Sequence, residues 1–154
     1  MVRLIILFSL TVSSLSPSLA VPVPDVTWSK FDEYSRLSER EEQERLKNLG
    51  IQLNNSKDLV VYVVVYGGKE SCVNEAKTRA NRVRRFLKQQ GIDSKRIRIV
   101  DAGQLLSWQI SLYIAHRSAQ PLTAKFINRH DGHLVESEVR VSRNCQKMLD
   151  ADLK

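Results

Sequence analysis

The run from Leu59 to Tyr66 constrains the fold of this chain more than any other stretch. It consists of a leucine, five valines and two tyrosines, and β-branched and aromatic side chains favour strands. Apolar residues fall on both faces, so we expect a central strand covered on two sides, or on one side and by a partner sheet. Gly67 and Gly68 follow the run and are expected to end the strand.

A helix is predicted on each side of this strand. The first, from about Ser38 to Asn54, carries a stripe of leucines and begins with a capping serine and acidic first-turn residues. The second runs from about Ser71 to Gln90, and Gly91 is expected to end it in the left-handed conformation. Its apolar residues recur in steps of three and four and are Val73, Ala76, Ala80, Val83 and Leu87.

Three further strands are expected from alternating or β-rich sequence. They cover residues Asp25–Tyr34, Arg96–Val100 and Ser107–Ala115. Together with the helices they give the order βαβαββ. This order predicts an α+β fold, in which a mixed four-stranded sheet packs on two helices.

The C-terminal extension, residues 118–154, has two interpretations. Leu122–Asn128 and Leu134–Val141 can pair as a hairpin, because the Asp131-Gly132 dipeptide between them favours a tight turn. Alternatively, the extension is a loosely packed tail that Cys145 pins to the domain. The sequence pattern does not decide between them.

Residues 1–20 are predicted to be a signal peptide. Arg3 supplies the positive charge, Leu4–Val12 the short apolar core, and Ser18-Leu19-Ala20 the small residues of a cleavage site. The apolar run is far shorter than the roughly 20 residues of a spanning helix, and an uncleaved anchor is the alternative. An extended leader, residues 21–25, follows. The exported chain is expected in the periplasm or outside the cell, without a transmembrane segment after cleavage.

Export places the two cysteines, Cys72 and Cys145, in an oxidising compartment. We expect a disulfide between them, which would contribute about 3–4 kcal/mol by closing a long loop, whereas two free thiols are the alternative. No paired-cysteine motif and no histidine at metal-ligand spacing accompanies them. Neither a catalytic nor a metal role is therefore predicted.

The chain is basic, with a formal net charge of +7 at neutral pH. Such a charge suits an anionic surface or polymer, and ordinary surface charge is the simpler alternative. Nucleic acid is not an expected partner, because export separates the chain from it and aromatic residues are few. Five basic residues of the second helix are expected on its solvated face, and they are Arg79, Arg82, Arg84, Arg85 and Lys88.

No sequence pattern predicts an enzyme. Gly-x-Ser-x-Gly, His-Glu-x-x-His and kinase-type motifs are absent from the sequence. His130, Asp131 and His133 cluster in a predicted turn, where a solvated loop is a simpler interpretation than a metal site or a catalytic base. We therefore expect no catalytic residue, cofactor or metal ion.

Two motifs resemble a known family. Arg79-Ala80-x-x-Val83-x-x-x-Leu87 matches a helix of the OmpA C-terminal-like domain, the peptidoglycan-associated module of bacterial cell envelopes. Gly91-Ile92-Asp93-x-x-Arg96-Ile97 matches the step into that family's third strand, at the right spacing from the first motif. The resemblance covers about Val26 to Ile114 and implies an OmpA-like domain over residues 26–117. The chain also looks similar to uncharacterised exported proteins of soil bacteria that have Tyr-Gly-Gly in the loop after the strand.

The family grips the diaminopimelate of the peptidoglycan stem with an aspartate after the strand and with the helix arginine. Here the aspartate is missing, and only Arg79 of that pair remains. The resemblance implies that Arg79 is the main ligand contact, assisted by the backbone amides of Gly67 and Gly68. The alternatives are an Arg79 that pairs with Glu75 at the edge of the core and a glycine pair that only forms a turn. Glu70 or Glu75 is a candidate substitute for the aspartate.

The function expected from this resemblance is that of an exported, non-enzymatic cell-envelope module. Such a module would bind peptidoglycan or another anionic wall polymer weakly. The alternative is an OmpA-like scaffold without a ligand that contacts another envelope protein. The sequence leaves the oligomeric state open.

Overall fold

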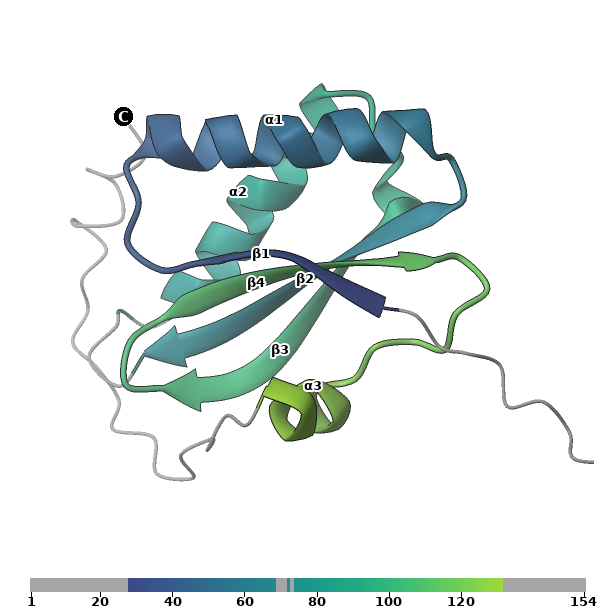
Figure 1. Ribbon diagram of the computed structural model, residues 1–154. Coiled ribbons are helices and arrows are strands. Elements are labelled where there is room, and N and C mark those ends of the chain that lie inside the picture. The colour runs from purple at the N-terminus through teal and green to yellow at the C-terminus, as the bar shows by residue number, and fades with distance from the viewer. Residues whose placement is uncertain (1–27, 69–71, 73, 132–154) are drawn as a thin grey trace, which may run out of the picture.

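The computed structural model describes residues 28–68, 72 and 74–131, and this part of the chain has the expected α+β class (Figure 1). The predicted signal peptide, the leader and residues 132–154 lie outside the described residues. None of the described helices is long and apolar enough to cross a membrane. The elements in chain order are β1 (Trp28–Tyr34), α1 (Glu39–Asn55), β2 (Leu59–Gly68), α2 (Glu75–Gln89), the short 3-10 helix η1 (Ser94–Arg96), β3 (Ile97–Leu105), β4 (Gln109–His116) and α3 (Ala124–Asp131).

The four strands form one mixed sheet in the order β1-β4-β2-β3. Strand β2 pairs in parallel with β3 and antiparallel with β4, and β1 pairs antiparallel with the outer side of β4. The expectation of a central strand buried on both faces is confirmed for β2. The expected end of this strand is wrong, because Gly67 and Gly68 continue it and pair with Gln104 and Leu105 of β3.

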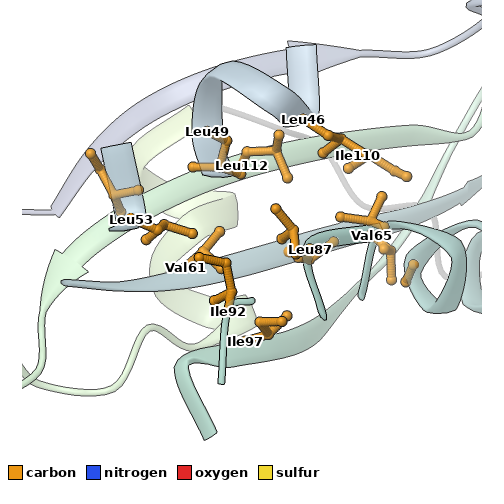
Figure 2. Close-up of a cluster of buried hydrophobic side chains, with 14 of the residues drawn as sticks. Leu46, Leu49, Leu53, Val61, Val65, Leu87, Ile92, Ile97, Ile110 and Leu112 are labelled. Carbon is orange, nitrogen blue, oxygen red and sulfur yellow. The ribbon is translucent and has the colours of Figure 1, made fainter. Parts of the chain in front are cut away.

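Helices α1 and α2 cover one face of the sheet (Figure 1). Three leucines of α1, with Ala80, Val83 and Leu87 of α2, pack on the valines of β2 that point to this face. Figure 2 shows how Leu46, Leu49 and Leu53 meet Val61, Val65, Ile110 and Leu112 across this layer. The apolar spacings in the sequence therefore identified the faces of both helices.

The opposite face of the sheet is covered by α3 (Figure 1). Of the two alternatives for the C-terminal extension, the hairpin is wrong for its first arm, because Leu122–Asn128 enters and forms most of α3; the other arm of that hairpin lies outside the described residues. A helical turn brings both Ile127 and Asn128 to the sheet, whereas a strand would point them to opposite sides. Ile127 is buried, and the Asn128 side chain donates to the Ala102 carbonyl and accepts from the Tyr66 hydroxyl.

The corners of the fold are fixed by local and by long-range contacts. Ser38 caps α1 in a capping box with Glu41, as its position before the acidic turn predicts. Gly91 follows α2 with φ of +83°, the left-handed conformation expected of it. The buried Arg96 donates to the carbonyls of Leu53, Ser56 and Leu59 at 2.7, 2.7 and 2.8 Å, so it joins the end of α1 to the start of β2.

Candidate functional site at the start of helix α2

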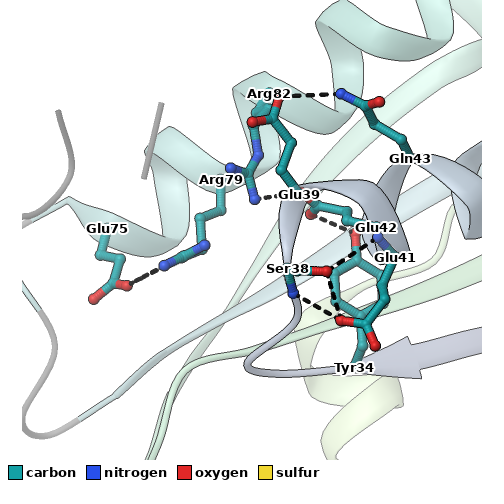
Figure 3. A network of polar contacts seen from close by, with 9 residues as sticks. All are labelled: Tyr34, Ser38, Glu39, Glu41, Glu42, Gln43, Glu75, Arg79 and Arg82. Carbon is teal, nitrogen blue, oxygen red and sulfur yellow. Dashed lines mark hydrogen bonds and ion pairs between the residues drawn. The ribbon is translucent and has the colours of Figure 1, made fainter. Parts of the chain in front are cut away.

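Arg79 lies on the first turns of α2 and is already bound by a glutamate of the same helix. Its Nε and Nη2 donate to Oε1 of Glu75 at 3.0 and 2.9 Å (Figure 3). The side chains are only 11% and 10% exposed, so the pair is largely withdrawn from water. The guanidinium and the carboxylate compensate each other's charge in this position. This is the arrangement expected if Arg79 has a structural role and does not bind a ligand.

The flat face of the same guanidinium lies against an aromatic ring. Cζ of Arg79 is 4.0 Å from the centre of the buried Trp108 ring. Such stacking is favourable because the ring face carries negative potential, and Arg adds planar contact area. Trp108 lies just before β4 and continues the alternation of Ile110 and Leu112, so its orientation toward the helices was readable from sequence. Its contact with Arg79 was not.

Glu75, one of the two candidate substitutes for the aspartate of the resembling family, is held by two groups within the chain. Its Oε2 accepts a hydrogen bond from the backbone N–H of Cys72 at 3.1 Å, while its Oε1 accepts from Arg79. In this structure the Glu75 carboxylate neutralises the charge of Arg79. Glu70, the other candidate, lies outside the described residues.

Gly67 and Gly68 form the end of β2, and the backbone just before β4 approaches Gly68 closely. A Cβ atom placed on Gly68 would lie 2.6 Å from the backbone nitrogen of Trp108 and 2.9 Å from the carbonyl carbon of Ser107. A side chain would therefore force the β3–β4 connection to move. At Gly67 the nearest atom would be 3.5 Å away, which is ordinary contact. The close approach gives Gly68 a packing role at this position.

Cys72 is buried where the chain passes from β2 to α2. The predicted partner, Cys145, lies outside the described residues, so the Cys72–Cys145 disulfide stays a prediction. Likewise, His133 is outside the described range, whereas His130 and Asp131 end α3 in place of the expected turn. Within the residues that the structure describes, no three His, Cys, Asp or Glu side chains are grouped so as to hold a metal ion.

A second buried polar cluster joins three elements of the fold. The Tyr34 hydroxyl of β1 donates to Oε1 of Glu42 at 2.9 Å, and Glu42 forms an ion pair with Arg82 of α2 (Figure 3). The carboxylate is only 3% exposed. Burial, and then the neighbouring Glu42 carboxylate, raises the pKa of Tyr34 far above its usual range. No local sequence pattern indicates this cluster, because Glu42 was expected only as an acidic first-turn residue of the first helix.

The prediction that the basic residues of α2 are all solvated is therefore wrong for its inner side. Arg79 is buried, and Arg82 reaches from α2 to the carboxylate of α1. Arg85 and Lys88 are exposed as expected, and Arg84 is half-buried. At 100° per residue, Arg79 and Arg82 lie about 60° apart on one flank of α2, whereas Arg84, Arg85 and Lys88 lie on the other flank.

Comparison with known proteins adds no relative. No protein-family model matches the chain, and none of the curated proteins is significantly similar to it. Any assignment to a family therefore depends on the motifs of the sequence and on the arrangement of the elements that contain them.

Proposed function

We propose that this chain is an exported, non-enzymatic OmpA-like module of the cell envelope. It binds an anionic wall polymer weakly, by charge attraction, and does not grip a peptide stem through Arg79. The proposal is supported by the mixed sheet with α1 and α2 on one face, which suits the βαβαββ arrangement of that family.

The residues that resemble the family have packing roles, which supports the fold part of the proposal. Ala80, Val83 and Leu87 form the buried stripe of α2. Gly91 ends the helix, and Arg96 binds three backbone carbonyls. These motif residues therefore account for a shared fold without requiring a shared ligand.

The functional part of the proposal depends on one observation: the Arg79 side chain is already bound by Glu75 and stacked on Trp108. A stem carboxylate would have to displace Glu75, and the glutamate would then lose a charge-assisted partner in a largely buried place. The family's specific grip is thereby disfavoured. The net charge of +7 for the full sequence, which becomes +6 when Arg3 is removed with the predicted signal peptide, still attracts polyanions without any such grip.

Co-sedimentation with purified peptidoglycan tests the proposal. The chain, purified after export, is compared with Arg79→Lys, which keeps the net charge but removes the guanidinium fork. We expect binding at about 10 mM salt that is lost near 150 mM and is equal in both proteins. Binding that survives the higher salt and depends on Arg79 would contradict the proposal, and so would a complete lack of binding at low salt.

A second candidate function, a scaffold that contacts another envelope protein, is favoured by one further observation. Leu106, in the β3–β4 connection next to Trp108, is 74% exposed. A photo-crosslinker at position 106 would then capture the same single protein repeatedly in exporting cells, and Leu106→Asp would abolish pull-down of that protein. A crosslinker at Ile51, which is 52% exposed on α1, is the matched control. Equal capture at both positions would contradict this candidate.

A further inference from the structure

The outer side of α2 carries a row of basic side chains, here called the basic face. It consists of Lys77, Arg84, Arg85 and Lys88. At 100° per residue these four positions fall within about 100° of one another, and they extend about 16 Å along the helix axis. They therefore lie along one flank of the helix and are not distributed around it.

No carboxylate compensates the basic face within the part of the chain that the structure describes. None of the four residues forms an ion pair there, whereas Arg45, Arg79 and Arg82 each pair with an acid. The only acidic residue of α2 is Glu75, and it is bound to Arg79. Helix α1, in contrast, mixes four glutamates with three basic residues.

Arg84 adds a polar atom that lacks a partner. Its Nε is buried from water and has no hydrogen-bond acceptor in the described structure. An unbound guanidinium N–H is costly to bury, so an outward rotation of the Arg84 side chain to a bound anion would give this N–H an acceptor. The basic face is therefore both charged and incompletely satisfied.

We propose that the basic face is the binding surface for a linear phosphodiester polymer of the cell wall, an inference that rests on the proposed function. A guanidinium binds phosphate oxygens in a fork, and an ammonium binds them as a point charge, so a mixed arginine and lysine row fits successive phosphates. The exposed side of α2 offers no large apolar side chain, which disfavours insertion into a membrane. A polymer lying along the helix axis meets all four charges.

The test measures binding of poly(glycerol phosphate) to the chain purified after export, by titration calorimetry at low salt. The test variant is Lys77→Gln, Arg84→Gln, Arg85→Gln and Lys88→Gln combined. The control variant combines Arg36→Gln, Arg40→Gln, Lys47→Gln and Lys95→Gln, which also removes two arginine and two lysine charges, at exposed positions elsewhere. We expect affinity to fall at least about tenfold in the test variant and less than about threefold in the control.

Equal losses in the two variants would overturn the proposal, because net charge alone would then explain binding. Tighter binding to polyglutamate or to a single-stranded DNA of equal charge would overturn it as well. Failure of the proposed function is seen separately in the peptidoglycan assay. If the chain binds the soluble polymer through the basic face but does not sediment with peptidoglycan, the inference about the basic face stands and the proposed function is wrong.

Discussion

The inner and outer sides of α2 use the same residue types for opposite purposes. On the inner side, Arg79 and Arg82 each contact a buried glutamate, and Arg79 also lies against Trp108. On the outer side, the basic face has no acidic partner among the described residues. An arginine on the inner side is part of the folded core, so its replacement should be visible in stability. Replacement on the outer side should be visible only in binding.

The largest expected effect is at Arg82. Arg82→Met leaves the Glu42 carboxylate buried without its ion-pair partner, and we expect a loss of about 3–5 kcal/mol in the free energy of unfolding. Urea unfolding measures it. Adding Glu42→Gln removes the stranded charge and should restore most of the loss. A loss below about 1 kcal/mol in the single variant would show that the inner pair does not support the fold.

Replacement of Arg79 should have the next largest effect. Arg79→Met strands a Glu75 side chain that is 10% exposed and removes the polar stacking on Trp108, so we expect a loss of about 2–3 kcal/mol. Thermal and urea unfolding both report it. An unchanged stability would contradict a structural role and would return Arg79 to the candidates for ligand binding.

Tyr34 gives the inner side a signature at alkaline pH. The pKa of the Tyr34 hydroxyl is raised in the folded chain. The contribution of Tyr34 to the free energy of unfolding is therefore fully present below the unfolded pKa of 10.0, and it falls as the pH rises above that value. Tyr34→Phe should cost about 1–2 kcal/mol at neutral pH, because Glu42 loses a donor. The difference in unfolding free energy between the two proteins should shrink by up to about 1.4 kcal/mol per pH unit above that value. A difference that is constant up to pH 11 would contradict the buried hydrogen bond.

The smallest effect on stability is expected for the basic face. The combined glutamine variant should differ from the parent by no more than about 0.5 kcal/mol, because its side chains form no ion pairs in the described structure. Arg84 and Lys88 are like charges four residues apart, so their removal relieves a weak repulsion. If urea unfolding shows that the variant loses more than about 1.5 kcal/mol of unfolding free energy, the basic face also supports the fold, and the proposed difference between the two sides of α2 is wrong.

Sequence patterns predicted the elements in which local periodicity and burial agree. The valine run gave β2, and the leucine and alanine spacings gave the buried faces of α1 and α2. The pairing of Arg79 with Glu75 was foreseen as one of two alternatives, because the residues are four positions apart.

Contacts between distant residues could not be predicted in the same way. Glu42 and Arg82 are joined only because α1 and α2 pack side by side, and no local pattern records that pairing. Helix α3 was missed for a related reason. Its sequence alternates well enough for a strand, and the choice of helix depends on Ala102 and Tyr66, which Asn128 must reach on the sheet.

The sheet order has a consequence for how the chain is made. Strand β2, the most apolar segment of the described chain, finds both of its neighbours, β3 and β4, later in the sequence. During synthesis both edges of β2 therefore stay unpaired until β3 and β4 have been made, and the corner before β2 is fixed only when Arg96 has been added. Open apolar strands are the segments that aggregate. A chain cut short before β4 should accordingly be insoluble, however well its first helix is capped.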